Sequence, residues 1–235
     1  MVCEHCGQIP GEEPSIGGRT SSPHAMVTAA GSEHVAFKEP FSPPGAAFEC
    51  GERPIRVGFM LDIVGYGWHD SPAKESLQRR LVGVVRLVFE DLGVALSDTE
   101  SQGMGDGVLV ILPARLDVQR ALPVLLRSMA ERLALDNAVS QDQMRVRMAA
   151  DVGPVGLTEL GFGGAMVTNM GRLLDSKPLR RWAAEHRERD LAVVMSDSLH
   201  RFVVAEGVPG LPREQFTRVQ VRAKELATNA WLWTR

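Results

Sequence analysis

The chain of 235 residues predicts an α+β fold, in which helices pack on a mixed, mostly antiparallel β-sheet. Two observations point to this class. Short apolar runs rich in β-branched residues alternate with longer segments whose apolar residues recur at helical spacing. The resulting order is β α β β α β α β α β β, and strands that follow each other without a helix between them favour antiparallel pairing. A doubly wound parallel sheet does not fit this order.

The first half of the folded part is expected to hold three strands and two helices. A strand is predicted at 55–64 (IRVGFMLDIV), a short apolar run typical of a buried strand. Strands at 94–96 and 108–112 flank the glycine-rich segment 103–107, which predicts a hairpin turn. The first helix is indicated by apolar residues in steps of three and four, at Leu77, Leu81, Val84, Val85 and Val88. A second helix is expected at 118–135.

The second half alternates between strands and helices and then closes with two strands. Segment 144–152 alternates as a strand does, and 163–175 begins with glycines and becomes helical. Ser196 and Asp197 are good residues for the start of a helix. The remaining strands are expected at 191–195, 219–221 and 231–233.

Composition and punctuation divide the chain into two parts. Residues 1–53 are rich in proline and glycine and are expected to form a disordered leader, while 54–235 are expected to form one domain. The net charge of −3 argues against nucleic acid as a partner, and no apolar run reaches the roughly 18 residues of a membrane helix. With no secretion signal and only three cysteines, we expect a cytoplasmic protein.

The leader contains a Cys-x-x-Cys pair, Cys3 and Cys6, which is half of a zinc site. Cys50, His24 and His34 could complete it, but no second close pair is present. We therefore expect free thiols rather than a structural zinc.

Two carboxylates stand at positions that could bind a metal ion. Asp62 ends an apolar strand and is followed by Gly65-Tyr66-Gly67, while Asp106 lies in the glycine hairpin. Two such groups side by side repel each other, and Mg²⁺ held by carboxylates and substrate phosphates would remove the repulsion. Gly65 and Gly67 would let backbone amides approach those phosphates. On spacing alone, a turn aspartate and a strand-end residue remain the favoured interpretation.

Five segments, in order, resemble the class III nucleotidyl cyclases. Asp62-Ile63-Val64-Gly65-Tyr66 is similar to their first metal motif, Asp-Ile-x-Gly-Phe/Tyr, and Gly105-Asp106-Gly107 to their second. The resemblance extends from about Ile55 to about Trp233 and is greatest to actinobacterial cyclase-like domains of uncertain role. The other three segments are 146–155 (VRMAADVGPV), 164–174 (GAMVTNMGRLL) and 193–196 (VVMS).

The resemblance implies an activity and a set of site residues. Asp62, Asp106 and the Ile63 carbonyl would bind two Mg²⁺ or Mn²⁺ ions, and Arg172 would stabilise the charged transition state. The substrate would be a nucleoside triphosphate, whose ribose 3′-hydroxyl attacks the α-phosphorus to give a 3′,5′-cyclic nucleotide and pyrophosphate. The resemblance also implies a homodimer with sites at the interface, and it places Lys224 near the phosphates, with Arg222 as the alternative for that role.

Several positions depart from the family pattern. The family asparagine falls on Thr168, with Asn169 beside it, and the base-reading pair falls on Gln102 and Gly161. Neither the usual adenine pair nor the usual guanine pair is therefore present. These residues are compatible with a pyrimidine cyclase of the kind that acts in antiphage signalling, with low selectivity, or with lost activity.

Two aromatic residues are further candidates for the nucleotide pocket. Tyr66 stands where the family has Phe or Tyr in the loop under the phosphates, and Phe59 could form a wall of the base pocket. Core packing is the favoured alternative for both, because aromatic rings mostly fill space.

The sequence leaves three functions open. We expect an active nucleotidyl cyclase, because two metal-binding carboxylates would be costly in a pure scaffold. The alternative is a catalytically degenerate dimer that acts as a signalling or nucleotide-sensing module, which the residues at 168 and 161 favour. A polymerase on a related palm-like sheet is disfavoured by the spacing between Asp106 and the glycine-led helix.

Overall fold

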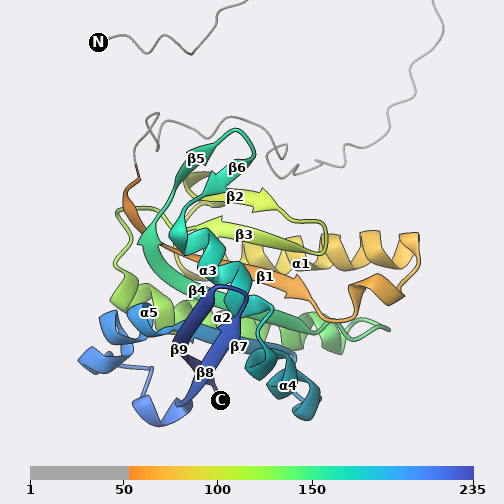
Figure 1. Cartoon of the computed structure of the whole chain (residues 1–235). Coiled ribbons are helices and arrows are strands. Elements are labelled where there is room, and N and C mark those ends of the chain that lie inside the picture. The colour runs from red at the N-terminus through yellow and green to blue at the C-terminus, as the bar shows by residue number, and fades with distance from the viewer. Residues whose placement is uncertain (1–52) are drawn as a thin grey trace, which may run out of the picture. The chain divides into compact units, whose positions relative to one another are not determined.

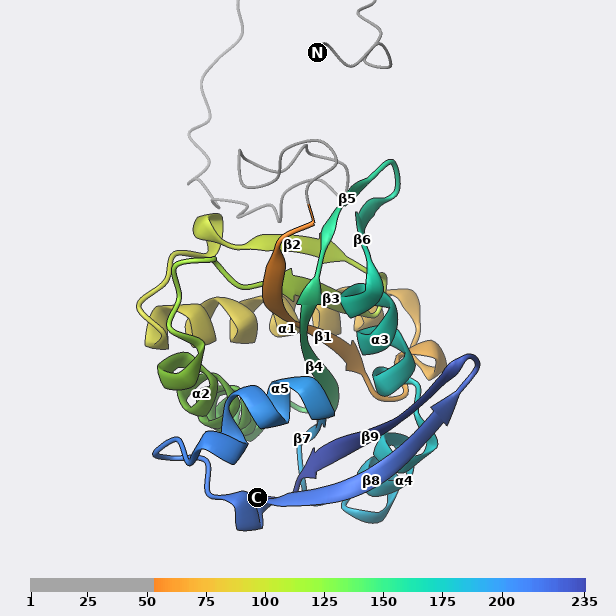
Figure 2. The same cartoon turned by 60° about the vertical axis from the view of Figure 1, so that its left-hand side comes forward.

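A computed structural model describes residues 53–235, except for the side chain of Leu96, and shows a mixed seven-stranded sheet (Figures 1 and 2). The strand order is β2-β3-β1-β4-β7-β9-β8, and only β4 and β7 are parallel neighbours. The predicted α+β class, with a mostly antiparallel sheet, is confirmed. The strands are β1 (Ile55–Ile63), β2 (Glu100–Gly103), β3 (Gly107–Ile111), β4 (Val146–Pro154), β7 (Leu191–Ser196), β8 (Phe216–Ala223) and β9 (Leu226–Trp233).

A leader was predicted at residues 1–53. Residues 1–52 of it, with the Cys3–Cys6 pair, lie outside the part of the chain that the structure describes. Among residues 53–235, no helix is long and apolar enough to span a membrane.

Helices cover both faces of the sheet and form two hydrophobic cores. One core lies beneath α1 (Ser71–Asp91), α2 (Val118–Ala138) and the short α5 (Asp197–Phe202). The other lies beneath α3 (Ala165–Leu174) and α4 (Lys177–Glu185), and α3 crosses over β1 and β4 (Figure 1). Alternate residues of each central strand enter opposite cores, because successive side chains of a strand point to opposite faces.

The sequence prediction was wrong at one strand and missed three elements. Segment 94–96 is not a strand: Val94 donates to the Phe89 carbonyl at 3.0 Å and closes α1, and a 3₁₀ turn follows at Leu96–Asp98. The true edge strand, β2, reads Glu-Ser-Gln-Gly and carries no apolar signal. The missed elements are α4 and a small separate hairpin made of β5 (Gly156–Thr158) and β6 (Gly161–Gly163).

The register of β1 determines what meets at its end. Asp62 is paired with Gly107 on β3 and with Arg147 on β4. Gly107 cannot carry a side chain, because an added Cβ would lie 1.8 Å from the Leu61 carbonyl oxygen. The Ile63 amide donates to the Asp106 carbonyl at 3.0 Å. The β2–β3 turn is thus held directly against the end of β1.

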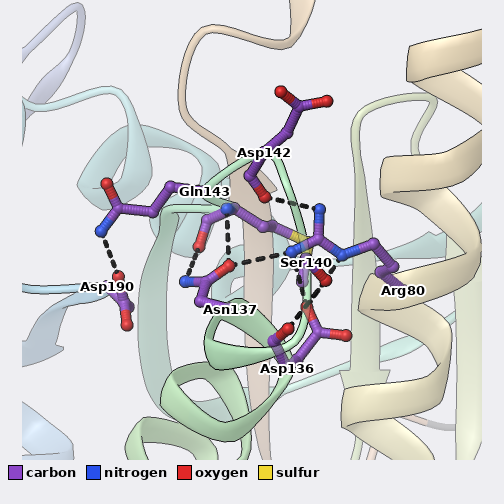
Figure 3. Close-up of polar contacts among 8 residues, drawn as sticks. Arg80, Asp136, Asn137, Ser140, Asp142, Gln143 and Asp190 are labelled. Carbon is purple, nitrogen blue, oxygen red and sulfur yellow. Dashed lines mark hydrogen bonds and ion pairs between the residues drawn. The ribbon is translucent and has the colours of Figure 1, made fainter.

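A polar network fixes the chain just before β4 (Figure 3). Arg80 donates to Asp136 at 2.8 Å, to Asn137 at 2.9 Å and to the Asp142 carbonyl at 2.8 Å. Asn137 in turn donates to the Met144 carbonyl at 2.9 Å and accepts from the Met144 amide at 2.7 Å. Helices α1 and α2 therefore position the start of the strand that carries Arg147.

Candidate functional site

The end of β1 places a buried carboxylate against an arginine. Arg147 donates from Nε to Asp62 Oδ1 at 2.9 Å and from Nη2 to Oδ2, so the contact is bidentate. The side chains of Arg147 and Asp62 are only 15% and 12% exposed. The arginine is on the neighbouring strand, directly opposite Asp62. Arg147 was not among the site residues predicted from the sequence.

Asp106 is the second carboxylate at this end of the sheet. Burial raises the pKa of Asp62, Arg147 opposes that rise, and the charges of Asp106 and Asp175 add to it. The charge of Asp106 thus reaches Asp62, and the role of the two carboxylates as metal ligands stays a prediction. Asp175 directly follows α3, so the end of that helix lies on the same side as Asp62.

The predicted donors, Asp62, Asp106 and the Ile63 carbonyl, would suit a metal that arrives with a substrate better than a resident one. No group of three or more His, Cys, Asp or Glu side chains within 53–235 could hold a metal ion. Two carboxylates and a backbone carbonyl leave most of the coordination sphere open. Mg²⁺ is commonly bound in this way, with waters and substrate phosphates as the remaining ligands.

The glycine loop after β1 forms a tight 3₁₀ turn, Tyr66–Trp68. Gly65 has a φ of 78°, which favours glycine, and its carbonyl accepts from the Trp68 amide at 3.0 Å. Tyr66 packs against the core beneath α1, with the Lys74 ammonium 5.6 Å from its ring centroid. Gly67 is exposed.

Phe59 lies apart from the candidate site. Its ring is fully buried beneath α1 and stacks on Phe89, with 6.3 Å between the ring centroids. Asp62 faces the opposite side of the sheet, because the two positions differ by an odd number of residues along β1. The contacts of Phe59 are those of core packing.

Helix α3 carries the predicted catalytic group, and its side chains point in different directions. Thr168 is exposed, whereas Asn169 hydrogen-bonds to the buried Asp151 on β4. Arg172 donates to Glu225 Oε1 from Nη2 at 2.9 Å and from Nε at 3.2 Å. Within residues 53–235, no hydrogen bond or ion pair joins Arg172 or Asn169 to Asp62 or Asp106.

Asp151 was not proposed as a functional residue from the sequence. It is 2% exposed and accepts from the Val152 amide at 2.7 Å and from the side chains of Ser196 and Asn169. Burial raises its pKa, while these hydrogen bonds lower it. The available signal was a carboxylate inside the otherwise apolar, alternating strand at 144–152.

The predicted base-reading positions are brought together. The Phe162 amide donates to Gln102 Oε1 at 2.9 Å, so one of the two acceptor positions of this oxygen is used. Gly161 has a φ of 106°, and a Cβ there would lie 2.2 Å from the same oxygen. Lys224 occupies the β8–β9 turn at a φ of 51°, next to Glu225.

No family model and no curated protein sequence matches the chain. Solved structures do match it. The adenylyl cyclase CyaB from P. aeruginosa has a TM-score of 0.52 at 13% identity, over 77% of this chain and 94% of that one. An adenylate/guanylate cyclase/hydrolase from Silicibacter pomeroyi gives 0.52 at 17% identity, over 78% and 98%. The catalytic core of a rhodopsin-guanylyl cyclase with converted specificity, in complex with ATPαS, gives 0.51 at 13%, over 77% and 96%.

The fold is that of a class III nucleotidyl cyclase catalytic domain. The cyclase fold accounts for nearly the whole length of these structures. At such low identity the similarity concerns the fold alone, and the functional argument depends on the residues of this chain.

Proposed function

We propose that this cyclase-fold domain converts a nucleoside triphosphate into a 3′,5′-cyclic nucleotide and pyrophosphate. The observation that carries the proposal is the position of Asp106 at the end of β1, where the Ile63 amide donates to its carbonyl and its charge raises the pKa of the buried Asp62. Neighbouring carboxylates repel each other, and a bound divalent cation would remove that repulsion.

The site residues would bind metal, contact the phosphates and stabilise the transition state. Asp62, Asp106 and the Ile63 carbonyl would hold two Mg²⁺ or Mn²⁺ ions, whose chemistry is to acidify the ribose 3′-hydroxyl and to neutralise the triphosphate. The amides around Gly65 and Gly67 would face the phosphates. Arg172 would donate to the charged α-phosphoryl group, because its planar fork matches phosphate oxygens.

Two complete sites would require a homodimer. Arg172 contacts Glu225 of its own chain and neither metal-site carboxylate. A partner copy could bring its Arg172 and Thr168 to Asp62 and Asp106, so that a two-fold dimer forms two equal sites. The Asp62→Ala and Arg172→Ala variants should each be inactive alone and should recover activity when mixed. Active wild type with no recovery on mixing would contradict the shared site.

Base selectivity is proposed to be non-standard. Gln102 replaces the usual base-reading residue, and Gly161 offers no side chain. UTP and CTP are therefore candidate substrates, and a role in cytoplasmic antiphage signalling follows if a cyclic pyrimidine nucleotide is the product. The test is to incubate the purified protein with Mn²⁺ and each of ATP, GTP, CTP and UTP and to measure cyclic product and pyrophosphate.

The second candidate is a catalytically degenerate dimer that senses nucleotides or acts as a scaffold. It is favoured by the exposed Thr168 in place of the family asparagine and by the pairing of Arg172 with Glu225. An intact dimer that binds nucleotide but forms no product from any of the four triphosphates would support this function and refute the cyclase.

A further inference from the structure

The buried carboxylate of Asp151 on β4 lies beneath α3, the helix that carries Thr168 and Arg172. We propose that Asp151 is a positioning residue, which fixes the rotation of α3 on the sheet through its hydrogen bond with Asn169. That rotation decides where Thr168 and Arg172 point. The inference rests on the proposed function, which gives these two side chains their place in a shared site.

Asp151 stands on the face of the sheet that α3 covers. It belongs to the same alternating set of β4 positions as Ala149, which is part of the core beneath α3. Its cross-strand neighbour on β1 is Gly58, where an added Cβ would lie 3.3 Å from Met166 Cε. The helix therefore approaches the sheet closely here, and Asp151 is buried between them.

Three donors hold the Asp151 carboxylate. The Val152 amide donates to Oδ1 at 2.7 Å, and the side chains of Ser196 and Asn169 also donate to the carboxylate. The Ser196 oxygen itself accepts from the Leu199 amide at 3.1 Å, so a helix cap fixes this donor. Two donors thus belong to the strands β4 and β7, and Asn169 is the donor that belongs to α3. The carboxylate therefore joins the helix to the sheet.

The other inward contacts of α3 are apolar and adaptable. They are made by Met166, Met170, Leu173 and Leu174. Methionine is flexible and can repack when a helix turns, and apolar contacts have no preferred direction. Among the described residues, Gly164 at the helix start receives no side-chain cap. The hydrogen bond from Asn169 is directional, so it restrains the rotation that the apolar contacts permit.

The rotation of α3 matters because it sets two proposed site residues at once. Successive residues of an α-helix are about 100° apart around its axis. With Asn169 turned to the sheet, the neighbouring Thr168 is exposed. Arg172 follows Thr168 by four residues and shares its face. A turn of the helix would move both side chains together, and a misplacement of about 1 Å can lower a rate about a hundredfold.

The test replaces Asp151 with leucine in the full chain, which removes the acceptor and keeps a similar volume. In a shared site, Asp151→Leu should behave as a variant of α3, and its own kcat should fall at least about tenfold. Mixing it with Asp62→Ala, whose α3 is intact, should restore activity, whereas mixing it with Arg172→Ala should restore none. Unchanged kcat, recovery with Arg172→Ala, or no recovery with Asp62→Ala would each overturn the proposal.

A reciprocal exchange tests the hydrogen bond itself. Asn169→Leu breaks the bond from the helix side and should lower kcat as Asp151→Leu does. Asp151→Asn combined with Asn169→Asp exchanges the two groups, keeps an amide–carboxylate bond between them, and should regain most of the loss. A double variant as slow as Asp151→Leu would contradict the role of this bond.

The chain offers a matched control for the loss of a carboxylate between two elements. Asp91 accepts from the Ser128 hydroxyl and from Arg132, at 2.9 Å and 2.6 Å for the latter, between the helices of the other face. Asp91→Leu should leave kcat unchanged at a temperature at which the protein is folded. A loss equal to that of Asp151→Leu would indicate general destabilisation and overturn the proposal.

A second measurement does not need turnover. Hydrogen–deuterium exchange followed by mass spectrometry reports the protection of the α3 amides, 165–174. Asp151→Leu should raise their exchange about tenfold, as the loss of a hydrogen bond to a charged group allows, and should leave α2 unchanged. Unchanged exchange of α3 in folded Asp151→Leu overturns the proposal.

The two proposals can therefore fail separately. If wild type forms no cyclic product while Asp151→Leu loosens α3, the fixation of the helix stands and the cyclase activity alone is refuted. Cyclic product from wild type, with the kcat and the α3 exchange of Asp151→Leu both unchanged, refutes the positioning role alone.

Discussion

Replacing Arg80 with alanine should destabilise the domain substantially, although this residue contacts no proposed ligand. The Arg80 side chain is 15% exposed and donates to Asp136, Asn137 and the Asp142 carbonyl. Its removal leaves a carboxylate that is only 22% exposed without its partner. Breaking a largely buried pair of this kind costs about 3 kcal/mol. For a domain of this size, that corresponds to a fall in Tm of roughly 6–12 °C.

Thermal and urea denaturation followed by circular dichroism would measure this effect. Arg115→Ala is the control, because Arg115 pairs with Asp98 while 75% exposed, and exposed pairs contribute at most about 1 kcal/mol. Equal losses of stability in Arg80→Ala and Arg115→Ala would refute the argument that the network in Figure 3 anchors the start of β4.

Three other changes have defined outcomes. Gly107→Ala should prevent the β2–β3 turn from docking, because its Cβ would lie 1.8 Å from a backbone carbonyl oxygen, and soluble yield with circular dichroism would show the loss. Burial lowers the pKa of His200, so the unfolded chain is protonated first as the pH falls, and the stability present above about pH 6.5 should be lost below it. Denaturation above and below pH 6.5 should show a smaller difference in the free energy of unfolding for His200→Phe than for wild type. An equal difference would contradict this cause. If the protein is a cyclase, Glu225→Gln should raise kcat by up to about fivefold by freeing Arg172, since an exposed pair contributes at most about 1 kcal/mol; a lower kcat would contradict the inhibitory pairing.

Much of the fold could be predicted because its signals are local. The apolar run at 55–64 and the three- and four-residue spacing after Leu77 each depend on neighbouring residues only, and they mark β1 and α1 correctly. Strand β2 could not be found in this way, because a polar edge strand is defined by its pairing with β3 and not by its own composition.

The candidate site shows the same division. The sequence by itself determined that Asp62 ends a strand and that Asp106 lies in a glycine hairpin, because both signals depend on neighbouring residues only. Only the tertiary structure decided that Arg147 holds Asp62, since that contact depends on the register between two strands separated by more than eighty residues. It also decided that Asn169 turns inward while Thr168 stays exposed, because the packing of α3 on the sheet sets the rotation of the helix.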